Sequence, residues 1–450
     1  MEDEGLPRLA IETFRHYFDQ LVGGATGLTP ESEIDPADGL PELGALDGYR
    51  HAGSTALEHA VVIKLNGGLA TSMGMTKAKS LLEIKPGLRF LDVIAEQVLA
   101  LRSEHDSPIP LLLMNSFRTR DDSLAALAPH GVELDGLPLD FVQHKIPRID
   151  AVTGRPVVWS RDPVHEWCPP GHGDLYTALV TSGALGALRG QGVRYAFVSN
   201  SDNLGATLDL RILGWMASER VPFAMEVTRR TRDDRKGGHL ARRRSDGGLL
   251  LREVAQCPEA DLAAFQDVER HRYFNTNNLW LDLDALQATL DARSAVLGLP
   301  IILNEKRCDP LDPGSPLAIQ VETAMGAAIG IFDGASALEV PRTRFAPVKT
   351  TGDLLAVMSD AYELTPDRRV VRHPDASPDL LVELDGDFYR RIDQFEARFP
   401  HGVPSLRACR ALRVCGDHVF GRDVVIRGEV SLENHAAEAV TIADGARLGD

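Results

Sequence analysis

The sequence predicts an α/β protein built on a mainly parallel sheet, with a helical N-terminal extension and a short parallel β-helix near its C-terminal end. Three observations support this. Short apolar runs alternate with helical patterns from about residue 57 to residue 346, as in βα units around a parallel sheet. A helical apolar pattern precedes that region, and apolar residues recur every six positions after it. We therefore expect a helical appendage over residues 1–55, a core domain over 56–370, and linker helices with a β-helix over 371–450.

The composition argues against several classes of protein. The 450 residues carry a formal net charge of −17, which disfavours nonspecific nucleic-acid binding. No apolar run approaches a membrane span, and the acidic start Met1-Glu-Asp-Glu4 differs from a signal peptide or presequence. We expect a cytoplasmic protein with neither nucleic-acid nor membrane partners. The five cysteines are scattered without a Cys-x-x-Cys pair, so we expect free thiols rather than disulfides or a zinc site.

The first expected helix lies in the N-terminal region. Ile11, Phe14, Phe18 and Leu21 repeat at three- and four-residue spacing, and Gly23-Gly24 ends the pattern. We interpret this segment as a helix that packs on the core and has no chemistry of its own.

The core is organised around a strand and a glycine-rich loop in residues 60–79. Val61 to Leu65 form a continuous apolar run that Gly67-Gly68 ends, which predicts a buried strand followed by a sharp turn. Ligand phosphates can approach backbone N–H groups at glycine, with Thr71 and Ser72 as further donors. Lys64, Lys77 and Lys79 add positive charge, so we expect an anion site here. The loop matches neither the P-loop nor the Rossmann fingerprint.

Further core elements follow in order. We expect a helix over residues 91–101 and strands over residues 109–114, 195–198 and 223–227. Ligands of such sheets bind at the carboxyl ends of the strands, so the polar residues after each run are the first candidates.

The last region has a different period. Val414, Phe420, Ile426 and Leu432 recur every six residues with glycines between them, which predicts a few coils of a parallel β-helix. We expect helices over residues 354–362 and 388–399 to join it to the core. We expect the exposed edge strand of such coils to pack either on the core domain or on another subunit, which would form a homo-oligomer.

Two polar segments point to a phosphate and metal site. Gly171-His-Gly-Asp174 reads as a helix start, in which Asp174 serves either as the N-cap or in function. Asn200, Asp202 and Asn203 follow a strand, where a carboxylate opposite a phosphate loop is the expected Mg²⁺ ligand. The other interpretation of the second segment is an Asn/Asp turn.

Three more segments fit a sugar phosphate. Asn275 and Asn277 alternate between Phe274 and Trp280, so both amides can face one side and bind sugar hydroxyls. Glu253 is either a hydroxyl acceptor or half of a surface ion pair. Lys349 ends a short apolar stretch, although surface lysines are usually only solvated.

Taken together, these motifs closely resemble the eukaryotic-type UTP–glucose-1-phosphate uridylyltransferases, also called UDP-glucose pyrophosphorylases. The resemblance covers roughly residues 57 to 450 and its motifs follow in order. They are Lys64-Leu-Asn-Gly-Gly-Leu69, Gln143 to Ile149, Gly171-His-Gly-Asp174, Ser199-Asn-Ser-Asp-Asn-Leu-Gly-Ala206, Met225-Glu-Val227, Lys236-Gly-Gly238, Phe274-Asn-Thr-Asn-Asn-Leu-Trp280, Gln320-Val-Glu-Thr-Ala324 and Pro347-Val-Lys-Thr-Thr351.

The resemblance implies a GT-A-like nucleotidyltransferase core, a left-handed β-helix, and the reaction of UTP with glucose 1-phosphate to give UDP-glucose and pyrophosphate. It implies that Asp202 binds Mg²⁺ and that Lys79, Lys349 and Asp202 carry the catalysis. The residues implied to bind the nucleotide are Leu65, Gly67, Gly68, Lys79, Gln143 and Gly171. Those implied to surround the sugar phosphate are His172, Asn200, Gly238, Glu253, Asn275, Asn277 and Lys349.

Two departures from the family pattern keep alternatives open. Ala70 replaces a glycine and Ala78 replaces a proline, which puts the tight turn and the loop's rigidity in question. A uridylyltransferase for N-acetylglucosamine 1-phosphate, or for several sugar phosphates, is one alternative. A non-catalytic nucleotide-sugar sensor is another.

Overall fold

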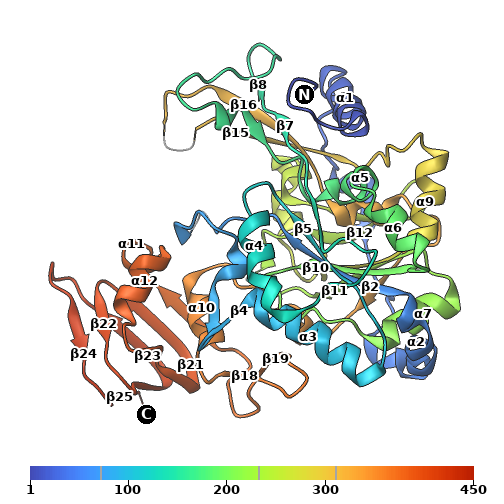
Figure 1. Ribbon diagram of the computed structural model, residues 1–450. Coiled ribbons are helices and arrows are strands. Elements are labelled where there is room, and N and C mark those ends of the chain that lie inside the picture. The colour runs from blue at the N-terminus through green and yellow to red at the C-terminus, as the bar shows by residue number, and fades with distance from the viewer. Residues whose placement is uncertain (71–72, 232–233, 310–311, 450) are drawn as a thin grey trace.

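The computed structural model describes residues 1–70, 73–231, 234–309 and 312–449. Within these residues the largest element is a ten-stranded mixed sheet with the order β1-β12-β14-β10-β2-β5-β6, beside which β11, β13 and β17 pair (Figure 1). Its strands are β1 (Ile34–Pro36), β2 (Ala60–Asn66), β5 (Leu111–Asn115), β6 (Asp140–Val142), β10 (Tyr195–Asn200), β11 (Phe223–Arg229), β12 (His239–Arg243), β13 (Leu249–Arg252), β14 (Tyr273–Asp282) and β17 (Ser336–Glu339).

The parallel part of this sheet places the candidate loops at one edge. β2 pairs in parallel with both β10 and β5, with Leu65 opposite Asn200 and Met114. β14 instead runs antiparallel to β10, β11 and β12. The four strands predicted from the apolar runs that begin near residues 60, 109, 195 and 223 are confirmed as β2, β5, β10 and β11. β1, by contrast, brings the N-terminal region into the sheet edge, which the sequence analysis did not predict.

Helices cover both faces of the sheet because successive side chains of a strand point to opposite sides. Val62 of β2 packs in the core cluster that contains α3 and α7, whereas Val61 and Ile63 pack with α5, α6 and α9. The helices of the chain are α1 (Arg8–Val22), α2 (Arg50–Ala56), α3 (Phe90–His105), α4 (Arg120–Leu127), α5 (Leu175–Thr181), α6 (Ala184–Gly190), α7 (Leu210–Glu219), α8 (Leu262–Phe265), α9 (Leu283–Ala292), α10 (Thr351–Met358), α11 (Gly386–Tyr389) and α12 (Ile392–Arg398).

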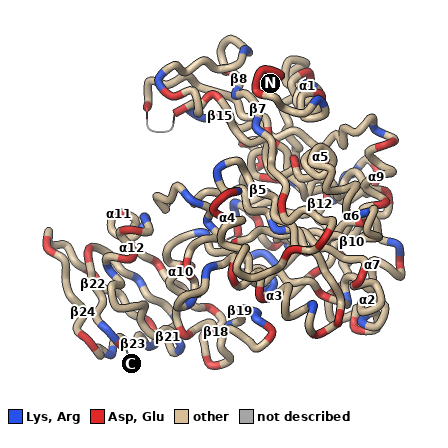
Figure 2. The backbone as a smooth tube through the Cα atoms, viewed as in Figure 1, with Lys and Arg blue, Asp and Glu red and all other residues tan. Residues whose placement is uncertain are grey.

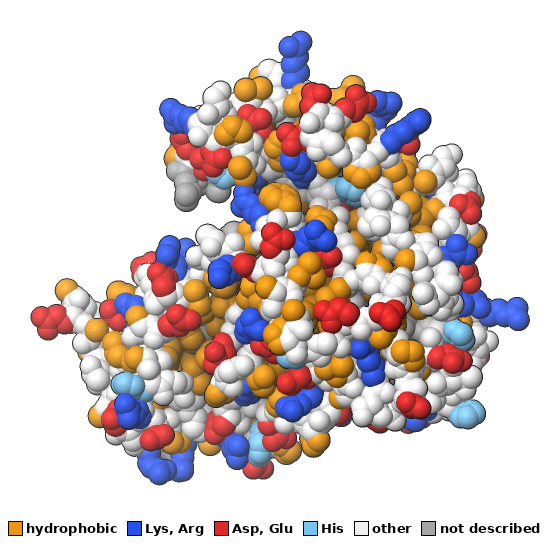
Figure 3. Space-filling view, in the orientation of Figure 1, with side chains coloured by type: hydrophobic (Ala, Val, Ile, Leu, Met, Phe, Trp, Pro, Cys, Tyr) orange, Lys and Arg blue, Asp and Glu red, His pale blue; other side chains and the backbone are white. Residues whose placement is uncertain are grey.

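A lobe of short strands projects beside the sheet. β15 (Ile301–Arg307), β16 (Leu317–Thr323) and β8 (Ile149–Asp150) form one antiparallel sheet, and β7 (Ile146–Pro147) pairs with β9 (Trp167–Cys168). The predicted N-terminal helix is α1, which lies next to this lobe (Figure 1). The surface is deeply hollowed between the lobe and the C-terminal strands (Figure 3).

The C-terminal region consists of stacked parallel strands. β20 (Leu381–Leu384), β21 (Ser405–Cys415), β23 (Val425–Glu433) and β25 (Arg447–Leu448) form one sheet, and β22 (His418–Phe420) pairs with β24 (Val440–Ile442). Val414 lies opposite Leu432, 18 positions later, so one coil takes up three of the six-residue repeats. The predicted helix over residues 354–362 is wrong at its end, because Tyr362 begins a strand, β18 (Tyr362–Leu364), which pairs with β19 (Val370–Arg372). The helix predicted over residues 388–399 is divided into α11 and α12.

The remaining general features agree with the composition. All five cysteines are free thiols, and only Cys415 is exposed. Among the described residues no helix has the length and apolar character needed to cross a bilayer. Basic and acidic residues are interspersed along the chain rather than gathered on one element (Figure 2).

A two-stranded hairpin, β3 (Glu83–Lys85) with β4 (Leu88–Arg89), follows the glycine-rich loop.

Candidate active site

The loops after β2 and β10 meet at the carboxyl edge of the sheet, as expected for neighbouring parallel strands. Lys79 Nζ donates to Asp202 Oδ2 at 2.7 Å, and the two side chains are 18% and 20% exposed. The backbone N–H of Lys79 also bonds Gly68 O at 3.2 Å. The structure therefore brings together the phosphate-site lysine and the metal-site carboxylate that the sequence placed 123 positions apart.

The other two lysines of the loop region differ from Lys79 in burial. Lys64 was expected to add charge to the loop, but it is buried and donates to Ser199 Oγ at 2.7 Å and Ala206 O at 2.8 Å. Burial lowers its pKa to about 7. Its contacts with Ser199 and Ala206 anchor the segment that carries Asp202. Lys77 is exposed, and the predicted donors Thr71 and Ser72 lie outside the described residues.

Three of the residues that the resemblance implies to bind the nucleotide, namely Gly67, Gln143 and Gly171, also lie together. Gln143 Nε2 donates to Gly171 O at 2.9 Å, and a Cβ at position 67 would lie 2.8 Å from Gln143 Oε1. Gly68 has open space where its Cβ would be. Gly171 has φ +78°, and its Cβ would lie 2.4 Å from Thr323 O. This glycine is therefore required by the backbone and by close packing on β16, which is a reason that the sequence analysis did not consider.

The segment after Gly171 is a helix start, as predicted: a 3₁₀ turn over His172–Asp174 leads into α5. The side chain of Asp174 makes no capping bond to α5; it accepts hydrogen bonds from His144 instead. Met325 N donates to His172 Nδ1 at 2.9 Å, and burial lowers the pKa of His172 to about 4. His172 is therefore neutral at pH 7 and carries its proton on Nε2.

The predicted sugar-facing residues form a second group. Asn275 Nδ2 donates to Asn277 Oδ1 at 2.9 Å, which confirms that both amides share one side of β14. The pairing with β11 is irregular at this point and Asn277 has φ +57°. A Cβ at Gly238 would lie 2.6 Å from the Glu253 carboxylate. Burial raises the pKa of Glu253, and a hydrogen bond from Asn275 opposes that shift, so Glu253 is not a surface ion pair.

Lys349 lies beside Phe274, the residue that precedes Asn275. Its Nζ is 5.7 Å from the ring centroids of Phe274 and Phe345, and the adjacent Val348 N donates to Asp202 O at 3.3 Å. This exposed lysine is thus held by aromatic faces next to the Asp202 segment.

A buried polar network next to the Asp202 loop was not predicted from the sequence. Glu226 accepts two bonds from Arg344, at 2.6 and 2.8 Å, and one from Trp280 Nε1 at 2.8 Å. Asn203 Nδ2 bonds Asn278 Oδ1 and Arg344 O, so the network anchors the loop that carries Asp202. The signal in the sequence was a glutamate inside the apolar run of residues 223–227, because a charge in a buried strand needs a partner.

The two departures from the family pattern have little effect on the backbone. Ala70 is not among the residues with positive φ, so a glycine is not required there. Ala78 has φ −56° and ψ 135°, a conformation that proline also adopts. Alanine therefore preserves the local geometry at both positions.

Asp202 fits a metal ion that arrives with a nucleotide. Among the described residues no group of three or more His, Cys, Asp or Glu side chains is suited to hold a metal. Magnesium in nucleotide sites commonly takes one or two carboxylates together with substrate phosphates. A single carboxylate beside a phosphate-site lysine matches that arrangement and does not match a stand-alone metal site.

Comparison with known proteins gives the same assignment as the motifs. The model of the family described as UTP–glucose-1-phosphate uridylyltransferase matches residues 12–427. This chain belongs to that family. A uridylyltransferase of the same name from Solanum tuberosum is 40% identical over 397 residues, which cover 88% of this chain and 81% of the plant protein. The one from Saccharomyces cerevisiae is 40% identical over 393 residues, which cover 87% and 77%.

Solved structures of the family extend the likeness to the whole chain. A variant of the UDP-glucose pyrophosphorylase from Leishmania major, crystallised with UDP-glucose, has a TM-score of 0.91 and 44% identity, and the match covers 100% of this chain and 96% of that one. A UDP-glucose phosphorylase from Trypanosoma brucei has a TM-score of 0.89 and 43% identity with the same coverage. Like these family members, the chain is a nucleotidyltransferase.

Proposed function

We propose that the chain transfers the uridylyl group of UTP to glucose 1-phosphate, giving UDP-glucose and pyrophosphate. The observation that carries this proposal is the Lys79–Asp202 contact of 2.7 Å. The Gln143–Gly171 and Asn275–Asn277 pairs are the further candidate contacts for the substrates. The names of the curated relatives and the UDP-glucose complex of the Leishmania major protein support the substrates.

The proposed mechanism needs no covalent intermediate. A phosphate oxygen of glucose 1-phosphate is already an anion and attacks the α-phosphorus of UTP in line, so neither a general base nor a protein nucleophile is required. Lys79 and Lys349 offset the repulsion between the two polyanions and stabilise the charge on the transferring group. Mg²⁺ held by Asp202 would supply Lewis-acid stabilisation of that group.

Binding of the two substrates divides between the two groups of residues. Leu65, Gly67, Gly68, Gln143 and Gly171 hold the nucleotide and select uracil. The residues that surround the sugar phosphate are His172, Asn200, Gly238, Glu253, Asn275, Asn277 and Lys349. The neutral His172 offers an Nε2–H donor, and the half-buried Glu253 offers an acceptor for a hexose hydroxyl.

Finer features of the architecture belong to the same proposal. We infer a GT-A-like core, a left-handed sense for the C-terminal coils and a cytoplasmic location. We also propose that the chain is divided into an N-terminal appendage (residues 1–55), a catalytic domain (56–370) and a linker with the C-terminal coils (371–450). Where an oligomer forms, we propose that the edge strand of the coils makes the contact between subunits. The parallel pairing of β21 with β23 and of β22 with β24 supports the coil interpretation.

Pyrophosphate release from UTP and glucose 1-phosphate, with and without Mg²⁺, tests the function. We expect Mg²⁺-dependent release, and a much slower rate when N-acetylglucosamine 1-phosphate replaces glucose 1-phosphate. Equal rates on both sugar phosphates would overturn the proposed specificity. Tight UTP binding without any release would favour a sensor, although the backbone at Ala70 and Ala78 removes the reason for suspecting one.

A further inference from the structure

A buried aspartate and histidine join the two segments that carry the proposed uracil-reading groups. His144 N donates to Asp174 Oδ2 at 2.7 Å, and His144 Nδ1 lies 2.9 Å from Asp174 Oδ1. The two side chains are only 7% and 5% exposed. Asp174 closes the turn that begins at Gly171, and His144 directly follows Gln143.

This pair fixes the orientation of Gln143 from behind. The N–H that Asp174 accepts belongs to the peptide bond between Gln143 and His144, so the carboxylate sets the plane of that peptide. Gln143 N donates to Asn115 O at 2.7 Å, and its side chain donates to Gly171 O at 2.9 Å. The side-chain amide of Gln143 is thus held by its own hydrogen bond to Gly171. The backbone that carries it is held by the hydrogen bonds of Gln143 N and His144 N.

The histidine ring is held on both edges. Its Nδ1 faces Asp174, and its Nε2 lies 3.0 Å from Thr181 Oγ1 on α5. With both ring nitrogens engaged, rotation of the ring would break two hydrogen bonds in a site that water cannot reach easily. His144 therefore connects the Gln143 segment to α5 as well as to the turn.

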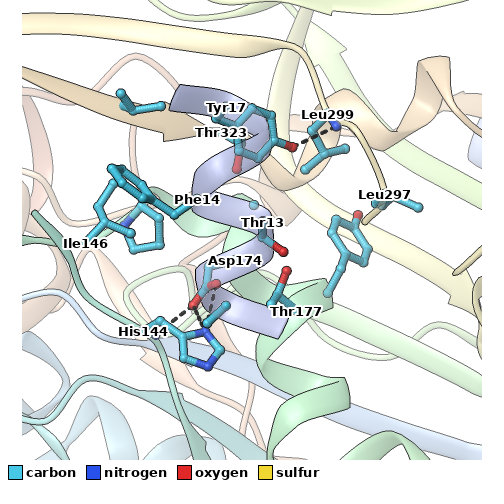
Figure 4. Close-up of a pocket in the computed structure, with 15 residues that line it drawn as sticks. Thr13, Phe14, Tyr17, His144, Ile146, Asp174, Thr177, Leu297, Leu299 and Thr323 are labelled. Carbon is cyan, nitrogen blue, oxygen red and sulfur yellow. Dashed lines mark hydrogen bonds and ion pairs between the residues drawn. The ribbon is translucent and has the colours of Figure 1, made fainter. Parts of the chain in front are cut away.

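The N-terminal helix closes this pair off from solvent. Thr13, Phe14 and Tyr17 of α1 face the small cavity of about 30 Å³ beside His144 and Asp174 (Figure 4). Tyr17 Oη accepts a hydrogen bond from Leu299 N at 2.9 Å, which fixes the helix there. A low-polarity surrounding strengthens the contact between carboxylate and imidazole.

The usual structural explanation for an aspartate at this place does not apply. Asp174 makes no capping bond to α5, and burial raises its pKa while His144 opposes that shift. A buried charged group is often replaceable by apolar residues without loss of stability, so stability alone does not explain this pair.

We propose that Asp174 is a positioning residue for nucleobase selection, which acts through His144 on the Gln143 amide. This inference rests on the proposed function. The ligand it serves is a uracil nucleotide, and the discrimination it supports is that between uracil and cytosine, whose Watson–Crick edges exchange donors and acceptors. When the side-chain amide of Gln143 is held in one orientation, its donor and acceptor are complementary to only one of these two edges.

The test is the selectivity of Asp174→Asn. We expect kcat/KM for UTP to fall at least about tenfold, the ratio of kcat/KM for UTP over CTP to fall by a similar factor, and kcat to change less than about threefold. In a Gln143→Ala background the same substitution should change the ratio less than about twofold, because the group that it positions is absent.

Asp92→Asn is the matched control. Asp92 also holds a histidine, with Oδ1 2.9 Å from His130 Nε2, and it is 8% exposed, but it lies on α3, which packs in a different core cluster from α5. This control should lower thermal stability without changing the UTP to CTP ratio. An Asp174→Asn variant that behaves in the same way, or that keeps its full effect in the Gln143→Ala background, overturns the proposal.

Two further measurements separate the possible failures. If Asp174→Asn does not accumulate as folded protein, His144→Asn keeps the backbone donor and removes the ring, and it should shift the ratio in the same direction. An unchanged ratio in that variant also overturns the proposal. Calorimetric Kd values for UTP and CTP report selection without turnover. A wild-type protein that selects UTP but releases no pyrophosphate would therefore refute the proposed function and leave this inference in place.

Discussion

The contact between Lys79 and Asp202 leads to a prediction with two opposite effects from one substitution. In the nucleotide-free protein the Lys79 ammonium lies 2.7 Å from the carboxylate that we assign to the metal. The lysine therefore competes with a divalent cation for Asp202 until the phosphates of UTP attract it. Lys79→Gln removes this competitor together with the charge that the transition state needs.

The structure sets the size of both effects. The two side chains are 18% and 20% exposed, so the pair belongs near the upper end of surface ion pairs, at about 1 kcal/mol. Mn²⁺ should then bind nucleotide-free Lys79→Gln about fivefold more tightly than the wild-type protein. Pyrophosphate release should fall by about 10²- to 10³-fold, as when one preorganised electrostatic group is lost.

Two measurements and one control test this reasoning. Free Mn²⁺ is measured by electron paramagnetic resonance in the absence of nucleotide, and pyrophosphate release is measured with both substrates. Lys77→Gln is the control, because Lys77 is exposed and only two positions away; neither quantity should change. An unchanged Mn²⁺ affinity in Lys79→Gln, or equal effects of the two substitutions, would refute the competition.

Four other substitutions test separate parts of the site. Lys349→Ala should lower kcat far more than it changes the KM for UTP, and an effect on that KM alone would place this lysine elsewhere. Ala70→Gly should leave the KM for UTP within about twofold, because φ at Ala70 is not positive; a tenfold improvement would contradict that geometry. The pKa of His172, about 4 in the folded protein and near 6.5 unfolded, means that the unfolded chain binds more protons between these values. The free energy of unfolding therefore decreases as pH falls from about 6.5 to 4. Between pH 7 and pH 5, measured by urea unfolding, this decrease should be about 2 kcal/mol smaller for His172→Gln than for the wild-type protein. Equal decreases would show that His172 is not buried in its neutral form. Glu226→Ala should lower the free energy of unfolding by about 3–5 kcal/mol, because the buried Arg344 guanidinium loses both hydrogen bonds to Glu226 and keeps as its ion-pair partner the more distant Asp209 carboxylate, at 3.8 Å. A loss below about 1 kcal/mol would contradict the network.

Much of the fold and of the candidate site could be predicted from the sequence because the signals are local. The apolar run of residues 61–65 ends at two glycines, which fixes a strand and its turn, and polar residues after β10 mark the same edge of the sheet. The sequence placed Asn275 and Asn277 on one side by alternation along an extended chain. Their mutual hydrogen bond confirms the shared side, but Asn277 has φ +57°, so the structure reaches it through an irregularity of the strand and not through simple alternation.

The predictions that the structure corrects failed for physical reasons that a local stretch of sequence does not contain. Lys64 was assigned to the anion loop because it precedes the glycines, but a residue's side of the sheet follows from strand register and from what packs on each face. The helix predicted over residues 388–399 shares one apolar pattern, and only the structure shows that it is divided into α11 and α12.

The sequence by itself therefore determined the family and the main elements, and it predicted the residues of the candidate site, since each is encoded by neighbouring positions. The tertiary structure alone decided which of these residues meet. Asp174 matches a helix N-cap from its sequence neighbours, yet it bonds His144, 30 positions earlier. Such a choice depends on distances between segments that a linear pattern does not contain. The contact between Lys79 and Asp202 arises in the same way, because two parallel strands bring distant loops to one edge of the sheet.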